Sequence, residues 1–114
     1  MQTVRLKKIS SFLKEEISKL ILSKRIKDPR VDTLVTVTDI EVARDLKYAK
    51  VYISYVGSKE RIDSIIIGLN HAAGFIQKEI GKVLHTRYTP RLSFFYDDSL
   101  ERGYRITKKI EELS

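Results

Sequence analysis

Residues 59–84 read KERIDSIIIGLNHAAGFIQKEIGKVL and decide the fold. Apolar residues recur through this segment at helical spacing, and no proline interrupts it. Gly74 follows Ala72 and Ala73 in the middle, although a glycine inside a helix costs roughly 1 kcal/mol relative to alanine. We therefore expect a sharp bend between two short helices at Ala72-Ala73-Gly74, where small residues let backbones, or a ligand, come close.

β-rich segments flank this helical pair on both sides. Residues 34–55 contain two strand-like runs around a turn and predict a hairpin. The first run changes the parity of its apolar positions near Thr38-Asp39, which predicts a β-bulge or a strong twist there. Gly57-Ser58 is expected to turn the chain and to N-cap the helix that begins near Lys59. A third strand is expected over residues 91–96.

The N-terminal segment has the pattern of an amphipathic helix. Its apolar residues recur three and four positions apart, with most of its lysines elsewhere on the circumference. The apolar positions are Leu6, Ile9, Leu13, Ile17, Leu20 and Ile21. Asp28-Pro29 ends this segment, because a residue before proline is disfavoured in helical geometry.

Length and charge predict one domain with a polyanionic partner. The 114 residues form one compact domain, 1–114, and carry a formal net charge of +7. Residues 1–30 hold nine basic and three acidic side chains, which is +6 of that charge. Such a concentration is the electrostatic footprint of a polyanionic partner. The alternative is a solvated helix face that only confers solubility.

The composition offers little material for catalysis. The absence of cysteine rules out disulfides and thiolate metal sites. His71 and His85 are isolated and fit neither a metal nor a triad spacing, and no phosphate-binding or dinucleotide motif occurs. We therefore expect no catalytic residue, no metal and no cofactor. No apolar run is long enough for a membrane span and no signal peptide is evident, so a cytoplasmic location without membrane contact is expected.

The order of elements is helix, strand, strand, helix, helix, strand, followed by a helical tail over about residues 99–113. The long connection between the second and third strands permits them to pair in parallel. We expect an α+β domain with a three-stranded mixed sheet and helices on one face. This order is that of a type II KH fold.

Four motifs, in chain order, resemble the ribosome-binding factor A family. The first two are Lys27-Asp28-Pro29-Arg30, and Asp45-Leu46 followed by Ala49-Lys50-Val51-Tyr52-Ile53-Ser54. The others are Ala72-Ala73-Gly74-Phe75-Ile76, and Arg87 leading to Pro90, Leu92, Phe94 and Asp97. The resemblance runs from about Arg5 to about Ile110 and also implies the KH-like fold. The chain departs from the family at Ala43, where a serine is usual, so a hydroxyl contact at that turn is in doubt.

The resemblance implies a bacterial, non-catalytic assembly factor. Such a factor binds the immature small ribosomal subunit near the 5′-terminal helix of its RNA and the decoding region. It aids late maturation and processing of the 5′ end of that RNA, and then leaves. Other assembly factors, including a GTPase, are implied as partners of a monomeric protein.

The expected RNA contacts are basic side chains, which position phosphates without reading sequence. They are Arg5, Lys7, Lys8, Lys14, Lys24, Arg25, Lys27, Arg30, Arg44, Lys47, Lys78, Lys82, Arg87 and Arg91. The Gly-Xaa-Xaa-Gly loop of ordinary KH domains is missing, because Gly68 and Gly74 are too far apart to form it. The bend at Ala72-Ala73-Gly74 either faces RNA or only lets the helices pack.

Two other functions are consistent with the same residues. One is a free-standing KH module for single-stranded RNA. The other is a protein interaction module that uses Tyr52 and Phe95 on an exposed sheet face, since the sheet needs helices on only one side.

Overall fold

The computed structural model describes residues 4–86 and 88–99, so the helical tail expected after Ser99 lies outside the described residues. The elements follow the predicted order. They are α1 (Val4–Leu22), β1 (Val35–Val42), β2 (Tyr48–Tyr55), the 3₁₀ turn η1 (Lys59–Arg61), α2 (Ile62–His71), α3 (Ala73–Gly81) and β3 (Arg91–Tyr96). Within these ranges no helix combines the length and the apolar character that a bilayer crossing requires.

The three strands form the mixed sheet that the sequence predicts. β1 pairs antiparallel with β2, and β2 pairs in parallel with β3. The register shifts between Val37 and Asp39, which confirms the bulge. The bulged residue is held from two sides, because the Thr38 hydroxyl lies 3.2 Å from the Tyr52 carbonyl oxygen and 2.5 Å from an Asp97 carboxylate oxygen.

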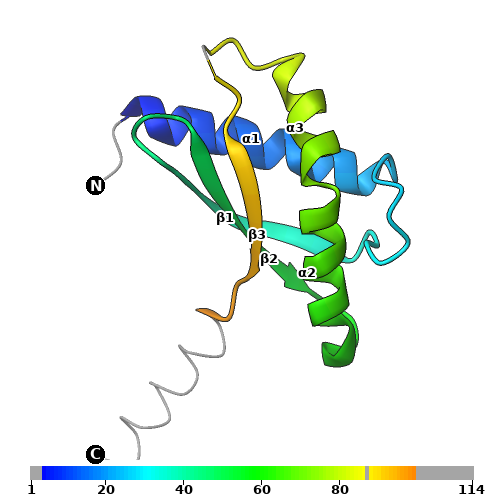
Figure 1. Ribbon diagram of the computed structural model, residues 1–114. Coiled ribbons are helices and arrows are strands. Elements are labelled where there is room, and N and C mark those ends of the chain that lie inside the picture. The colour runs from blue at the N-terminus through cyan, green and yellow to red at the C-terminus, as the bar shows by residue number, and fades with distance from the viewer. Residues whose placement is uncertain (1–3, 87, 100–114) are drawn as a thin grey trace, which may run out of the picture.

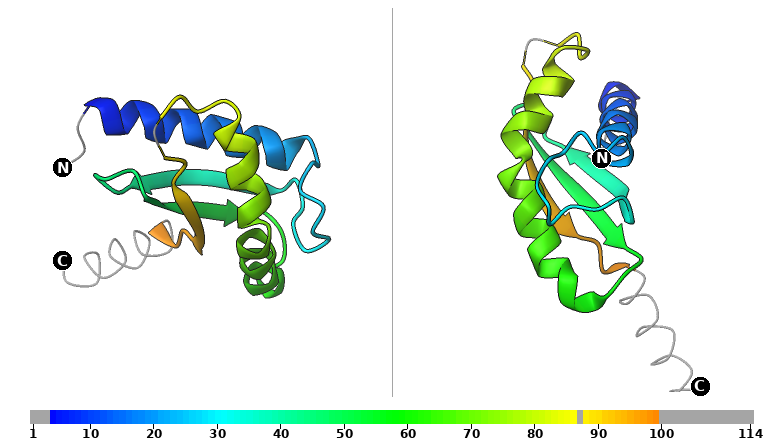
Figure 2. Two further views of the ribbon diagram at one scale, coloured as in Figure 1. Left: turned by 45° about the horizontal axis from the view of Figure 1, so that its top comes forward. Right: turned by 90° about the vertical axis from the view of Figure 1, so that its right-hand side faces the viewer.

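Helices α1, α2 and α3 cover one face of the sheet (Figures 1 and 2). Strand residues alternate between that covered face and an open one, as the pleat requires. The core lies between the sheet and the helices, and its fully buried side chains include Leu13, Ile17, Val37, Val51, Ile53, Ile65, Leu69, Ile76, Ile80 and Phe94. On the open face Phe95 is 42% exposed and its ring lies 5.9 Å from that of Tyr52, so Phe95 points outward.

The outer edge of β3 is bonded to the helix pair through two amide side chains. The Asn70 amide accepts a hydrogen bond from the Phe94 N–H at 2.9 Å and donates one to the Phe94 carbonyl at 3.1 Å. Gln77 accepts one from the Leu92 N–H at 2.9 Å. Backbone groups that a missing fourth strand would leave unpaired are therefore satisfied by α2 and α3.

The entry into the helix pair differs from the expected cap. Ser58 precedes η1, but its side chain makes no capping hydrogen bond, and α2 follows from η1 through Arg61. Instead the Tyr55 ring covers the turn, so closely that a side chain at Gly57 would collide with it. The Tyr55 hydroxyl holds the ring there by donating to the Asp32 carboxylate at 2.9 Å.

Candidate RNA-binding surface

The outer face of α1 presents cations that no carboxylate neutralises. Arg5, Lys7 and Lys8 are exposed, because the apolar stripe of the helix is turned towards the sheet. Within the described part of the chain, none of these three side chains takes part in an ion pair. Lys14 is also exposed, and its ammonium donates to the Thr38 carbonyl at 3.4 Å. Lys19, by contrast, is paired with Glu15 and Glu16.

The end of α1 positions two further predicted cations. Lys24 has a φ of 59°, and the Arg25 N–H bonds back to the Leu20 carbonyl, as in a Schellman cap. This turn directs Arg25 towards α3, where its guanidinium lies 3.1 Å from a Glu79 oxygen. Lys82 lies 3.2 Å from the other Glu79 oxygen. The structure therefore joins Arg25 and Lys82 around one carboxylate.

The charge on Glu79 is maintained by these two cations. Partial burial opposes its ionisation, but the hydrogen bonds from Lys82 and Arg25 outweigh that cost and hold the pKa of Glu79 below its ordinary value. Glu79 is thus an anion at neutral pH and offsets part of the positive charge of Arg25 and Lys82. These two residues present less net charge to a phosphate than the α1 cations do.

The loop after α1 is built around Asp28. The Arg30 guanidinium donates to both carboxylate oxygens, at 2.9 and 2.6 Å, and the Arg30 backbone N–H donates at 3.0 Å. The last bond closes a turn in which the Asp28 side chain bonds the backbone two residues on. The Arg30 hydrogen bonds hold the pKa of Asp28 far below its usual range, against the opposing effect of burial. Arg30 therefore serves this turn, whereas Lys27 remains exposed.

The Asp28 loop lies against α2 at Gly68, a contact that sequence reasoning missed. A Cβ at position 68 would lie 2.9 Å from the Arg30 Cβ and 3.2 Å from an Asp28 oxygen. His71, one turn further along α2, places its Nδ1 3.2 Å from the other Asp28 oxygen. The sequence did offer one clue to this contact: Gly68 lies inside a helix, where neither a turn nor a cap explains a glycine.

The bend between α2 and α3 lies at Ala72, as expected within Ala72-Ala73-Gly74. Ala72 has a φ of −85° and a ψ of 0°, and the Ile76 N–H still bonds to its carbonyl at 3.0 Å. Gly74 does not allow a close approach of helices, because no atom lies within 4 Å of a Cβ built there. Close approach of two backbones, one of the two uses expected of the small residues at this bend, is therefore not the use of Gly74. The angles of Ala72 lie in the bridge region beside the helical one, where φ is negative and a glycine is not required.

Gly74 instead opens onto solvent beside two predicted cations. Gly74, Lys78 and Lys82 are spaced four residues apart along α3 and its end, so they follow one side of the helix. All three are exposed. The exposed backbone at Gly74 and the exposed ammonium of Lys78 form a second group of candidate RNA contacts.

A third group of predicted cations lies where the hairpin turn meets the start of β3. The Arg91 N–H donates to the Lys47 carbonyl at 2.8 Å, which holds the turn and β3 together. The turn itself is closed by Asp45, whose carboxylate accepts from the Lys47 N–H at 3.0 Å. Arg44 is exposed in the same turn. Arg87 lies outside the described residues.

The three groups lie on different elements, namely α1, α3, and the hairpin turn with the start of β3. The hairpin turn and the N-terminal half of α1 lie towards the same end of the molecule, whereas α2 and the Asp28 loop lie towards the other (Figures 1 and 2). In the described ranges there is no cluster of three side chains able to ligate a metal. The arrangement suits an extended polyanion that contacts several separated cations.

Comparisons with known proteins agree with this geometry. The family described as "Ribosome-binding factor A" matches residues 5–110. A ribosome-binding factor A from Acetivibrio thermocellus is 47% identical over 110 residues, which cover 96% of this chain and 89% of that protein.

Solved structures with the same fold come from Thermus thermophilus. The crystal structure of its ribosome-binding factor A is 22% identical, with a TM-score of 0.67, covering 80% of this chain and 94% of that one. A homology model of the Thermus protein, fitted into a cryo-EM map of a 30S–RbfA complex, has a TM-score of 0.62 at 22% identity. That match covers 78% of this chain and 91% of the Thermus chain.

Proposed function

The chain belongs to the ribosome-binding factor A family, and from this we propose that it is a non-catalytic assembly factor that binds the immature small ribosomal subunit. Its ligand is the RNA of that subunit. Its role is late maturation of the particle and processing of the 5′ end of this RNA. The similar Thermus protein, fitted into a 30S complex, supports the choice of subunit.

The observation that carries this proposal is the unpaired positive charge along α1. Arg5, Lys7 and Lys8 face solvent without a carboxylate partner in the described residues. When such cations meet phosphates, counterions leave the nucleic acid, and the entropy gained favours binding. The affinity depends on charge and not on sequence, which suits a protein that grips a folded RNA.

Because these contacts are electrostatic, the complex dissociates readily. Ion pairs with phosphates weaken steeply as salt rises, and they break when the RNA backbone moves. We propose that the protein is a cytoplasmic monomer and that a structural change in the maturing RNA releases it. Other assembly factors, including a GTPase, are proposed to act with it. The exposed backbone at Gly74, beside Lys78, is the proposed place of close approach to the RNA.

The two histidines are proposed to have no chemical role. The His71 Nδ1 lies 3.2 Å from an Asp28 oxygen, in a loop that Arg30 already holds with three hydrogen bonds to Asp28. His85 is exposed beyond the end of α3. The double variant His71→Ala, His85→Ala should therefore still support normal processing of the RNA in cells that lack the parent protein.

The central test compares two double variants with the same change in charge. Lys7→Gln with Lys8→Gln removes unpaired cations of α1, whereas Lys19→Gln with Lys59→Gln removes two cations outside the predicted set. Binding to purified free small subunits is measured by cosedimentation over a range of salt. We expect the first variant to bind more weakly and to lower the salt slope by roughly 0.7–0.9 for each phosphate that it no longer neutralises. The second should match the parent.

Equal slopes and affinities for the two variants would exclude α1 as an RNA contact. Binding of the parent to short oligonucleotides, with none to the free subunit, would favour a general single-stranded RNA module. Retention by neither ligand would favour a protein partner on the open sheet face at Phe95.

A further inference from the structure

Tyr48 is an aromatic side chain that the fold exposes and leaves unengaged. It begins β2, where Ala49 and Val51 point into the core, so Tyr48 projects onto the open face. Its side chain is 57% exposed. Tyr52 and Tyr55 donate their hydroxyls to Glu41 and Asp32, whereas the Tyr48 hydroxyl has no such partner among residues 4–86 and 88–99.

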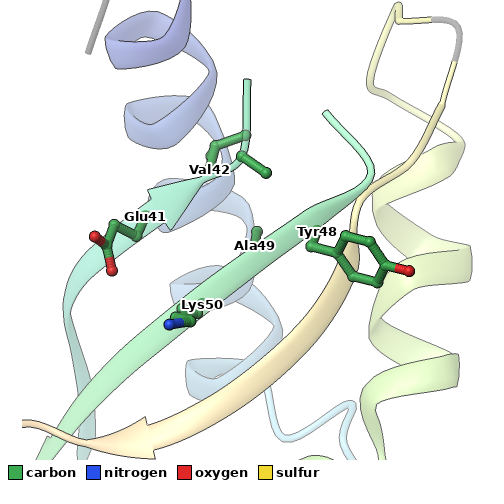
Figure 3. A pocket seen from close by; sticks show the side chains of 6 residues that line it. Glu41, Val42, Tyr48, Ala49 and Lys50 are labelled. Carbon is green, nitrogen blue, oxygen red and sulfur yellow. The ribbon is translucent and has the colours of Figure 1, made fainter. Parts of the chain in front are cut away.

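A shallow cavity lies beside Tyr48 on the open face. Its volume is about 230 Å³, and Figure 3 shows Glu41 projecting from β1, Lys50 from β2 and the Tyr48 ring reaching over towards β3. Val42, Ala43 and Ala49 complete the lining. Pockets for drug-sized ligands usually measure roughly 300–1,000 Å³, so this cavity suits something smaller, such as one planar ring system.

Four basic residues lie close to Tyr48 in the sequence or in the strand register. Arg91 is the partner of Tyr48 in the parallel register, and Lys47 precedes Tyr48 in the chain. Arg44 and Lys50 lie on the same hairpin. In the described ranges none of these four cations is in an ion pair. The nearby acids are Glu41, which accepts from Tyr52, and Asp45, which closes the turn.

We propose that Tyr48 stacks against one unpaired base of RNA, while Lys47 and Arg91 hold the phosphates on either side of that nucleotide. The inference rests on the proposed function and adds a base-stacking subsite to it. Aromatic rings stack with any base, because every base has a π-face, and flanking cations supply the backbone contacts.

The choice of RNA over a protein partner follows from this mixture of groups. A protein interface has a core from which charged residues are depleted. Here the exposed ring has Arg91 as its partner in the strand register and shares the lining of the cavity with Lys50, whereas Val42 and Ala49 are buried. A nucleotide, with an apolar ring between charged phosphates, matches this order of groups.

The first experiment compares Tyr48→Ala and Tyr48→Phe in binding free small subunits. Losing a stacked base should weaken the affinity of Tyr48→Ala by about 5- to 150-fold. The salt slope should stay that of the parent, because every cation that faces a phosphate is kept. Tyr48→Phe keeps the ring and should bind within about twofold of the parent. Val56→Ala, at the opposite end of β2 and 78% exposed, is the control and should have no effect.

The second experiment reads stacking directly and needs no ribosome. The chain has no tryptophan, so Tyr48→Trp introduces a single indole whose fluorescence a stacked base quenches. A single-stranded RNA octamer should quench it, whereas the same sequence in a duplex should not, because paired bases are already stacked. Val56→Trp should remain unquenched by both.

The two experiments separate this inference from the proposed function. If Tyr48→Ala binds subunits as tightly as the parent and RNA does not quench Tyr48→Trp, the proposal of a stacking subsite is wrong. This conclusion does not depend on the result for the Lys7→Gln, Lys8→Gln variant. If Tyr48→Ala loses subunit binding but Tyr48→Trp is not quenched by RNA, a ribosomal protein contacts Tyr48 and the RNA assignment fails. If the octamer quenches Tyr48→Trp but the protein does not bind free subunits, the stacking subsite is supported and the proposal that the subunit is the partner is wrong.

Discussion

Gly68 and Gly74 lie on the two helices of the bend and have opposite surroundings. Gly68 is buried under the Asp28 loop, so closely that a methyl group would displace the Arg30 Cβ at 2.9 Å. Gly74 faces open space. Neither has a positive φ, so space alone distinguishes the two residues. Gly68 thus makes room for a loop that is distant in the sequence, whereas Gly74 leaves its own backbone exposed.

Alanine at each position should shift stability in opposite directions. Gly68→Ala gains about 1 kcal/mol of helix propensity, but overpacking typically costs about 1–3 kcal/mol, so we expect a net loss of about 1 kcal/mol. Gly74→Ala meets nothing and should gain up to about 1 kcal/mol. Urea unfolding followed by circular dichroism measures both. Equal effects of the two substitutions would contradict the packing at Gly68.

Sequence reasoning located the bend and left two tasks open for its glycine, and the open space around Gly74 argues against the packing one. Ala72-Ala73-Gly74 drew attention because small residues are consecutive there, whereas Gly68 stood alone among isoleucines. What fixes Gly68 is the loop at Asp28 and Arg30, far away in the chain. Likewise the predicted cation Arg30 proved to be paired with Asp28, and Arg25 with Glu79. Local patterns place a charge on the surface, but they do not reveal a partner that tertiary structure brings to it.

At the scale of elements, the amides of Asn70 and Gln77 attach the helix pair to the sheet. They meet backbone groups on the edge of β3 that would otherwise lack partners. On a helical wheel both residues read as solvated polar positions, and for that reason the sequence did not reveal this role. The hairpin and its bulge at Thr38 were predictable, because alternation within one strand records which face each residue takes.

Removing the Asn70 amide should loosen β3. Asn70→Ala leaves the Phe94 N–H and carbonyl without their partner, and an unsatisfied buried group costs about 1–3 kcal/mol. We expect a lower urea midpoint with an unchanged m-value. Ser64→Ala is the matched control, because the Ser64 hydroxyl bonds only to the Arg61 carbonyl and touches no strand. If the two variants had the same midpoint, the bonds to β3 would carry no stability.

At the scale of the whole molecule, Asp28 fastens the basic N-terminal region to the helix pair. It binds Arg30 in its own loop and His71 on α2, while Arg25 reaches Glu79 on α3. The end of α1 and the loop that follows it are thereby joined to both helices of the bend. Such preorganisation lowers the entropy lost when a single ligand engages both.

This fastening should give the protein a marked sensitivity to acid. The folded state lowers the pKa of Asp28, chiefly through the Arg30 hydrogen bonds, while the unfolded value is about 3.9. The contribution of Asp28 is therefore complete above that value and is lost as the pH falls below it. Asp28→Asn should melt below the parent at pH 7, and the difference should shrink towards about pH 3. A difference in melting temperature that stays constant with pH would contradict this linkage. So would the same pH dependence in the control Asp63→Asn, whose side chain is exposed.

The parallel pairing of β2 with β3 also has a consequence for synthesis of the chain. β2 is complete at Tyr55, yet its partner does not begin until Arg91, after both helices have been made. During translation the hairpin therefore emerges with one long side of β2 unpaired, and an unpaired strand is a template for another chain. The interval between Tyr55 and Arg91 is then the period in which the nascent protein is most exposed to misassembly. Slow codons placed within that interval should lower the soluble yield more than slow codons placed after Tyr96.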